Sequence, residues 1–234
     1  MDVLLDAFRW LADPANWTGA NGIAMRSVEH LQLTAASVLI ACAVALPIAL
    51  WLGHIGRGGT VAINISNVGR AVPTFAVLVL LFLTPLGLSI WTTIIALVLF
   101  AIPPILTNAY VGMREVERDA VDAARGMGMA GLQLLRKVEL PLAVPLIMNG
   151  IRLAAVQVVA TATIAAFVAG PGLGRIITAG FGRQDYAQMV AGAILVAVLA
   201  LVVEGLMELL LRRVDPLRRA RRAGGARRVA VTEV

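Results

Sequence analysis

The sequence is poor in the residue types that build most catalytic and metal sites. It contains one cysteine, two histidines and only 15% charged residues, and aromatic residues make up 5% of the chain. The single Cys42 excludes a disulfide framework and a cysteine-based metal site, and we expect it to be a small core residue. His30 and His54 have no second ligand near them in the sequence. The pattern therefore predicts no metal site.

Other familiar signals are also missing. No Gly-x-x-x-x-Gly-Lys-Ser/Thr phosphate loop occurs in the chain. The start, "MDVLLDAFRWLADP", is acidic, and Asp6 and Arg9 interrupt its apolar run, so we expect no cleavable signal peptide. No ten-residue segments alternate as those of a β-barrel do. The net charge of +6 does not indicate a nucleic-acid partner, because most arginines flank apolar segments.

Long apolar stretches are what the sequence does have. Hydrophobic residues make up 59% of the chain and the mean hydropathy is +0.86. Several stretches reach the ~20 residues that a helix needs to cross a bilayer. The composition predicts an all-α, polytopic transmembrane bundle. We expect about five spans, near residues 31–52, 60–83, 90–112, 145–168 and 189–211.

Three further segments complete the predicted organisation. Residues 1–30 form an N-terminal segment whose charges recur at helical spacing, which predicts a short interfacial helix that stops near Pro14. Residues 114–141 form a polar loop between the third and fourth spans. Residues 212–234 form an arginine-rich tail.

The distribution of lysine and arginine predicts the orientation. With five spans, fourteen of these residues fall on the side of the tail and of loop 114–141, and four fall on the other side. Positive residues concentrate on the cytoplasmic side of membrane proteins. We therefore expect a cytoplasmic C-terminus and an N-terminus outside.

Within loop 114–141, the stretch "DAARGMGMAGLQLLRKVELP" predicts a helix–turn–helix at the membrane surface. Gly128 is expected to cap the first helix. Leu132, Leu135 and Val138 are expected to share a face of the second helix, which Pro141 breaks or redirects. A short exposed helix of this kind can insert into a groove on a soluble partner.

The spacing of this loop resembles the EAA loop of permease subunits of bacterial ABC importers. That motif has Glu-Ala-Ala, a glycine and then Ile-x-Leu-Pro; here Asp replaces Glu and Val replaces Ile. The matching residues that the resemblance assigns to ATPase coupling are Asp122, Ala123, Ala124, Gly128, Leu140 and Pro141. The resemblance implies that the first loop helix docks on a cytoplasmic ATPase subunit. It implies no catalytic site and no cofactor in this chain, because ATP and Mg bind the partner.

Three more stretches resemble the osmoprotectant branch of that family, which takes up glycine betaine, carnitine and choline. They are "SNVGRAVPTFAVLVLLFL", "AGPGLGRIITAG" and "AGAILVAVLALVVEGLMELLLRRVDP". The resemblance implies a multi-pass protein of the bacterial cytoplasmic membrane. Its expected partners are membrane lipid, a second permease subunit (the same or a sister chain), two ATPase subunits and a separate extracytoplasmic binding protein.

Alternative functions remain open at this stage. A permease for another small solute, such as an amino acid or an ergothioneine-like betaine, fits the same loop. An ion-coupled carrier or channel fits less well, because no carboxylate lies well inside the expected spans. The loop also argues against a structural membrane anchor. Few aromatic residues are available to hold a quaternary ammonium ion, so we expect selectivity to reside in the binding protein.

Polar residues inside the second and fourth spans are candidates for the translocation path. Asn67, Arg70 and Pro73 form a polar, proline-opened stretch that is a candidate path lining. Arg70 can alternatively extend to the membrane surface. For Arg152 we expect the same behaviour, or pairing with a loop carboxylate. The charged residues at the end of the last span are expected to pair on one helix face.

Glycines mark the remaining candidates. Gly170, Gly172 and Gly174 predict either an external gate with a flexible backbone or a tight re-entry turn. The glycines expected to permit close helix packing are Gly112, Gly150, Gly192 and Gly205.

Overall fold

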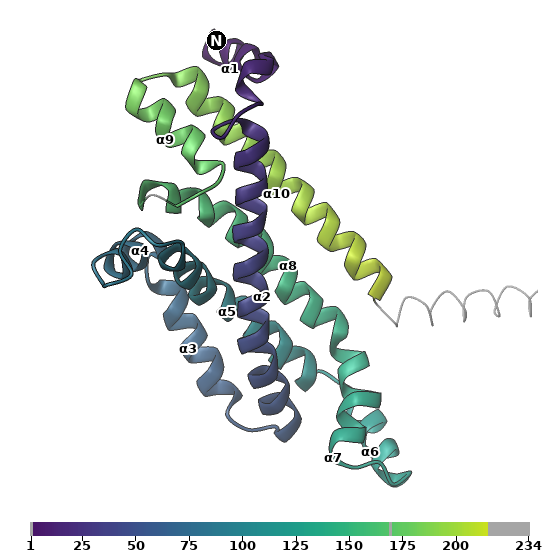
Figure 1. Cartoon of the computed structure of the whole chain (residues 1–234). Coiled ribbons are helices and arrows are strands. Elements are labelled where there is room, and N and C mark those ends of the chain that lie inside the picture. The colour runs from purple at the N-terminus through teal and green to yellow at the C-terminus, as the bar shows by residue number, and fades with distance from the viewer. Residues whose placement is uncertain (1, 169, 215–234) are drawn as a thin grey trace, which may run out of the picture.

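The computed structural model describes residues 2–168 and 170–214, and these fold into an elongated helical bundle (Figure 1). The α-helices are α1 (Asp2–Ala12), α2 (Ile23–Ile55), α3 (Gly59–Ala71), α4 (Thr74–Phe82), α5 (Ile90–Arg114), α6 (Arg118–Gly126), α7 (Gly131–Leu134), α8 (Leu140–Ala165), α9 (Gly174–Arg183) and α10 (Tyr186–Val214). A π-turn (Leu135–Glu139) and two 3-10 turns (Pro14–Asn16 and Ala166–Val168) connect some of them. Most of the predicted tail, residues 215–234, lies outside the described residues.

Among the described residues, four stretches are long and apolar enough to cross a membrane. They are Ile23–Ile55, Ile90–Arg114, Gly131–Val168 and Tyr186–Val214. The predicted second span is two helices, α3 and α4, bent by 77°. The break falls at Val72 and Pro73, both of which are extended, because proline lacks an N–H and disfavours helix at the preceding residue. The bundle has five spans if this bent pair is counted as one.

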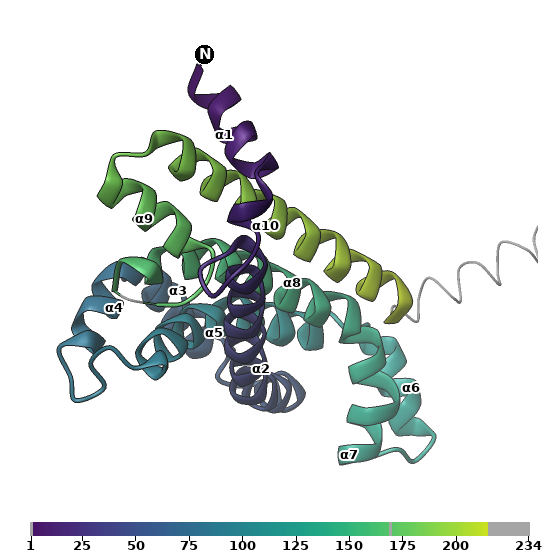
Figure 2. The same ribbon diagram turned by 45° about the horizontal axis from the view of Figure 1, so that its top comes forward.

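The core lies where α2, α5 and α8 pack together. The buried face of α2 repeats every four residues and consists mostly of small side chains. Its members are Leu33, Ser37, Ala41, Ala45, Ala49 and Gly53. Residues at this spacing share one helix face, and small residues let neighbouring helices approach closely. Seen with the top of the molecule turned forward, α2 crosses the middle of the bundle (Figure 2).

Close glycine contacts fix α8 against α5. A Cβ at Gly150 would lie 2.7 Å from Cβ of Asn108 and 2.9 Å from the Pro104 carbonyl oxygen, and one at Gly112 would lie 2.9 Å from Cβ of Leu146. Gly192 is similarly close to Ile177. The packing role predicted for these three glycines is confirmed. The prediction was wrong for Gly205, which has open space around its Cα because α10 is largely exposed.

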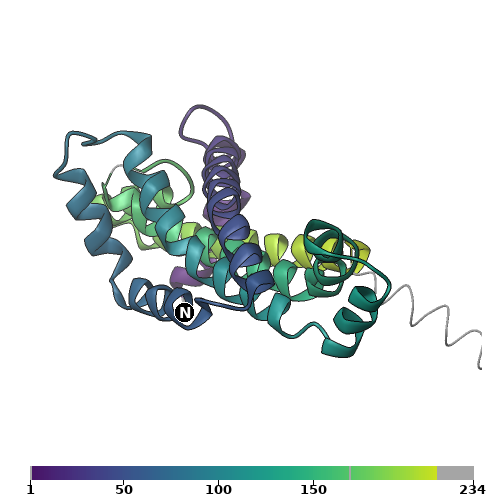
Figure 3. The same cartoon turned by 90° about the horizontal axis from the view of Figure 1, so that it is seen from below.

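The N-terminal helix and loop 114–141 lie at opposite ends of the molecule (Figure 1). α1 packs on α10 and ends at Ala12, and the Asp13 carboxylate accepts from the N–H of Ala15. This confirms the predicted stop near Pro14. Leu4, Leu5 and Phe8 are exposed on α1, as expected for a helix that rests on a lipid interface. Viewed from below, α6 and α7 (teal) lie on the other side of the bundle from α3 and α4 (blue) (Figure 3).

Candidate functional site

Loop 114–141, called the coupling loop below, presents a short polar helix on the surface. α6 covers Arg118–Gly126, as the sequence predicts. Asp122 and Ala123 are exposed, and Asp122 pairs with Arg125 at 3.4 Å on the same face. Ala124 is buried, with 2% of its surface exposed. Asp122 and Ala123 therefore face outward. Ala124 lies on the buried side of α6, which packs on the neighbouring π-turn and on α7.

Gly128 ends α6 in the way the sequence predicts. Its φ is +84°, its N–H donates to the Arg125 carbonyl at 2.9 Å, and the N–H of Met129 donates to the Ala124 carbonyl at 3.1 Å. This pair of bonds is the Schellman motif, which favours glycine at the left-handed position. An added Cβ would meet nothing within 4 Å. Glycine is therefore required here for its backbone conformation, and the surrounding space is open.

The second half of the coupling loop differs from the prediction at Pro141. α7, the π-turn and α8 run on as one continuous helical stretch, with Pro141 in the first turn of α8. The N–H of Leu140 bonds to the Leu135 carbonyl in the wider π pattern. Proline lacks an N–H and normally clashes with the carbonyl four residues earlier, and a π-turn changes that register. Pro141 therefore does not break the helix, and redirection of the chain there stays a prediction.

The predicted apolar face of this second helix is only partly buried. Leu132 is 57% exposed, whereas Leu134 is buried and Leu135 and Val138 are half-buried. Met127 is a second large apolar side chain exposed on this loop, at 71%. Sequence reasoning did not single out Met127. The coupling loop therefore exposes two large apolar side chains as well as Asp122 and Ala123. Leu140 and Pro141 lie half-buried behind it.

A buried carboxylate joins the coupling loop to α2. Glu139, the last residue of the π-turn, is 6% exposed, and its Oε2 lies 2.5 Å from Nδ1 of His54 near the end of α2. A buried carboxylate requires such a partner. The sequence offered a signal, since Glu139 is the only carboxylate between Asp122 and Pro141. The role of His54 as the partner of Glu139 was missed.

The candidate path residues lie around the break between α3 and α4. Asn67 and Pro73 are exposed on the subunit surface, and the side chain of Arg70 lies outside the described residues. Ser66, Gly69, Val72 and Thr74 from the same segment line an apolar groove of about 730 Å³, together with α5. The bent segment between α3 and α4 therefore lies beside an apolar groove. The role of Asn67, Arg70 and Pro73 in translocation stays a prediction.

The candidate gate glycines are packed tightly. Gly170, Gly172 and Gly174 are all buried. Gly172 has φ +102°, and a Cβ there would lie 2.9 Å from Nδ1 of His30. A Cβ at Gly170 would lie 2.7 Å from the Ala165 carbonyl oxygen. These contacts are those of the tight re-entry turn, one of the two alternatives that the sequence left open, and gating stays a prediction.

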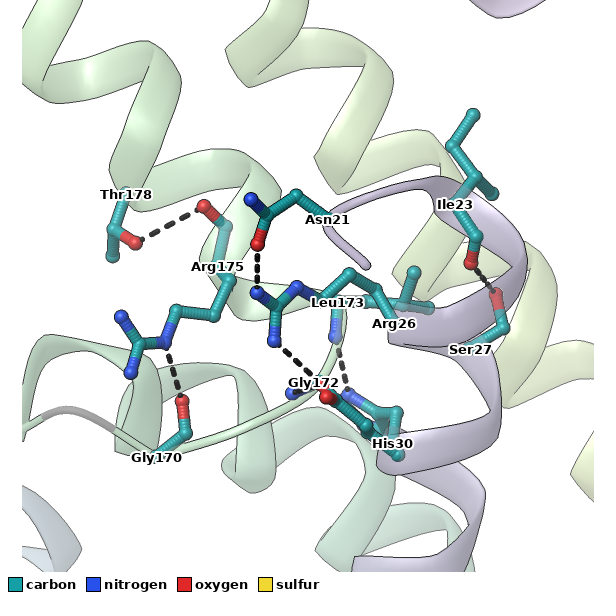
Figure 4. Close-up of polar contacts among 11 residues, drawn as sticks. Asn21, Ile23, Arg26, Ser27, His30, Gly170, Gly172, Leu173, Arg175 and Thr178 are labelled. Carbon is teal, nitrogen blue, oxygen red and sulfur yellow. Dashed lines mark hydrogen bonds and ion pairs between the residues drawn. The ribbon is translucent and has the colours of Figure 1, made fainter. Parts of the chain in front are cut away.

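Two side chains of α2 hold this turn, called the glycine loop below (residues 170–174). The N–H of Gly172 donates to Oε2 of Glu29 at 3.0 Å, and the N–H of Leu173 donates to Nδ1 of His30 at 3.2 Å (Figure 4). Because Nδ1 accepts, Nε2 carries the proton and donates to the Val159 carbonyl of α8 at 2.9 Å. His30 is fully buried and joins three parts of the fold. Sequence reasoning missed both roles, since it placed the first span after His30.

A polar cleft of about 560 Å³ lies beside the glycine loop. Its lining includes Asn16, Asn21, Arg26, Arg175 and Arg183, from the N-terminal segment and from α9. Arg26 pairs with Glu29 at 2.6 Å, and Nε of Arg175 donates to the Gly170 carbonyl at 3.1 Å (Figure 4). Both contacts brace the glycine loop. The cleft lies at the opposite end of the molecule from the coupling loop.

The charge inside the fourth span pairs with the fifth span. Arg152 of α8 bonds to both Glu204 and Glu208 of α10, and Arg212 pairs with Glu208 at 2.8 Å. The predicted pairing along α10 is confirmed for Glu208 and Arg212. The expectation for Arg152 was wrong in its partner, because α10 packs beside α8 and brings two helix carboxylates within reach. The described residues hold no group of three or more His, Cys, Asp or Glu placed to bind a metal.

The sequence is similar to those of known transport proteins. Residues 35–216 match the family described as "Binding-protein-dependent transport system inner membrane component". The chain is 31% identical to the glycine betaine/carnitine/choline transport system permease protein OpuCB of Bacillus subtilis (strain 168), over 85% of this chain and 91% of that one. It is 36% identical to the carnitine transport permease protein OpuCB of Listeria monocytogenes, over 87% and 94%.

A solved structure shares the fold. The chain aligns with a chain of the MetNI methionine ABC transporter, in inward-facing conformations, with a TM-score of 0.70 and 22% identity. The alignment covers 82% of this chain and 95% of that one. The helical bundle, its four to five apolar spans and the matched range agree with one another. The chain therefore belongs to the family of inner membrane components of binding-protein-dependent transport systems.

Proposed function

We propose that this chain is the permease subunit of an ATP-driven importer for osmoprotectants such as glycine betaine, carnitine or choline. The observation that carries the proposal is the exposed α6–Gly128 element inside a chain 31–36% identical to permeases named for these solutes. The scarcity of aromatic residues supports a weak path through the membrane. Selectivity then belongs to an extracytoplasmic binding protein.

The coupling loop is the proposed contact with a cytoplasmic ATPase, which would bind ATP and Mg. Asp122, Ala123 and Met127 supply its exposed surface, and Gly128 fixes the end of α6. Ala124, Leu140 and Pro141 act through packing, since they seat the loop on α8. The wild-type surface places small and charged side chains where a groove of a soluble partner can admit them.

The proposed assembly contains two permease subunits, two ATPase subunits and one binding protein. The exposed surface around α3, α4 and the apolar groove leaves room for a second permease subunit, the same chain or a sister chain. Asn67, Arg70 and Pro73 would then line the path between the subunits. The excess of positive residues near the coupling loop supports its cytoplasmic placement, with the N-terminus outside.

Reconstitution in proteoliposomes tests the proposal. The complete transporter is assembled with its ATPase and binding protein, and uptake of labelled glycine betaine is measured with and without ATP. We expect ATP-dependent uptake that unlabelled choline or carnitine reduces. Uptake by the lone chain would instead indicate a carrier or channel. Competition only by an amino acid or an ergothioneine-like betaine would keep the importer and replace the substrate.

A further inference from the structure

α2 is anchored by polar contacts at both of its ends. The helix runs without interruption from Ile23 to Ile55. His30 and His54 are 24 residues apart, which at 1.5 Å per residue is about 36 Å and exceeds the ~30 Å hydrocarbon core. One histidine contacts the glycine loop and the other contacts the coupling loop. α2 therefore connects the two candidate functional segments directly.

At one end, the contact between His54 and Glu139 is specific. The 2.5 Å separation joins Nδ1 of His54 to a buried carboxylate at the end of the π-turn. π-turns are local irregularities that often mark functional positions. α6 and α7 pack on this π-turn. A displacement of α6 would therefore act on the π-turn that ends at Glu139, and the contact of Glu139 with His54 would pass it to α2.

At the other end, α2 grips the backbone of the glycine loop. Glu29 and His30 accept the N–H groups of Gly172 and Leu173, at 3.0 and 3.2 Å. Gly172 approaches His30 too closely for any other residue, since an added Cβ would lie 3.1 Å from the His30 Cα. The hydrogen bonds to two successive amides and this close contact restrict sliding of the glycine loop along α2. The glycine loop must follow α2 when α2 moves.

Between its ends, α2 is supported as a stiff element. Its small-residue face packs against α5 and α8 over its length, and closely packed helices shift as units rather than deform. Pro47 removes one hydrogen bond, yet the helix continues through it. Gly53, next to His54, lies against Met113 of α5. This support keeps the two ends of α2 in a fixed relation.

We propose that α2 is the transmission element of this permease, carrying movement of the coupling loop across the membrane to the glycine loop. His54 and Glu139 are positioning residues at one end, and Glu29 and His30 are positioning residues at the other. The proposal rests on the proposed function only in taking the coupling loop as the driven element. The energetic link between the two loops is a property of this chain alone and can be measured without partners.

Amide hydrogen exchange on the purified full chain tests that link. In His54→Leu we expect the amides of Gly172 and Leu173 to exchange at least about fivefold faster, the lower end of typical coupling between sites. Glu139→Gln is a milder second variant, should His54→Leu fold poorly. Glu204→Gln is the control, because it weakens a pair between α8 and α10 that does not involve α2. It should leave these two amides unchanged.

Coupling must also work in reverse. Coupling between two sites is reciprocal, so Glu29→Ala, which removes the acceptor of the Gly172 N–H, should also speed exchange at residues 135–139. Faster exchange of the π-turn in His54→Leu, with unchanged Gly172 and Leu173, would overturn the proposal. The same holds if Glu204→Gln acts on the glycine loop as strongly as His54→Leu does.

A second readout separates transmission from simple structural support. In proteoliposomes with the complete transporter, His54→Leu and Glu29→Ala should lower the ratio of solute taken up to ATP hydrolysed, by about fivefold or more. The double variant should be no worse than the poorer single variant, because both act on one path. A loss of uptake and hydrolysis in proportion would overturn transmission. Absence of uptake by the wild type would instead refute the proposed function, and the exchange result would stand by itself.

Discussion

Gly172 lies so close to His30 that an added Cβ would sit 2.9 Å from Nδ1 and 3.1 Å from Cα of the histidine. The same glycine has φ +102° and donates its N–H to Glu29. Its backbone conformation and the space around it therefore both require glycine at this position. The glycine loop is held against α2 by specific hydrogen bonds and by close packing.

Replacing Gly172 with alanine should destabilise the protein. The left-handed backbone disfavours a side chain by about 1–3 kcal/mol, and the contact with His30 adds to this cost. Thermal unfolding in detergent should show a lower midpoint. Gly182→Ala is the matched control in α9, where an added Cβ meets nothing within 4 Å. An equal midpoint for the two variants would contradict the assigned contact.

Ala123→Leu should abolish ATP-driven uptake while the protein still folds and inserts. Ala123 is exposed on α6, so the larger side chain disturbs no internal packing, but it blocks close approach by a partner. Uptake in proteoliposomes and the yield of folded protein are the measurements. Ala130→Leu, at another exposed alanine of the coupling loop, should keep uptake. Normal uptake by Ala123→Leu would remove the docking role.

Gly128→Ala should cost about 1–2 kcal/mol, because only the backbone conformation is penalised. Its surroundings are open, in contrast to those of Gly172. Gly128→Asn should cost less, since asparagine tolerates the left-handed region. Unfolding midpoints of the two variants give the order. A bulky residue at Gly128 should additionally abolish uptake, and unchanged uptake would show that the end of α6 does not dock.

Two helix glycines should respond in opposite ways to alanine. Gly150→Ala should lower the free energy of unfolding by about 1–3 kcal/mol, because its Cβ would collide with Asn108 and Pro104 of α5. Gly205→Ala should raise it by about 0.5–1 kcal/mol, since its surroundings are open and alanine favours helix. Denaturant titration of both variants measures the difference. The same sign for both would contradict the observed packing of α8.

Arg152→Ala should destabilise the bundle, because it removes the cation that α8 places against the carboxylates of Glu204 and Glu208. Replacing the two glutamates with glutamine in the same chain should recover part of the loss, because neutral amides are less costly there. Thermal unfolding of the single and triple variants is the comparison. A triple variant less stable than Arg152→Ala would show that the glutamates stabilise the fold through other contacts.

The sequence by itself determined the fold class, the approximate spans, α6 and the cap at Gly128. These features depend on local quantities, namely the length of apolar runs, the spacing of residues along a helix and the backbone preference of glycine. The break at Pro73 follows from the same local chemistry. It was predicted as an opened helix, but the size of the bend depends on how α4 packs.

Only the tertiary structure decided which polar residues meet. Glu139 and His54 are 85 residues apart, Arg152 and Glu204 are 52 apart, and Glu29 and Gly172 are 143 apart. Pro141 was misjudged for a related reason, since the π-turn before it accommodates a residue that ordinarily interrupts a helix. Contacts between distant segments depend on how α2, α5, α8 and α10 pack in three dimensions. The periodicity of residues along a single helix does not predict how the helices pack against one another.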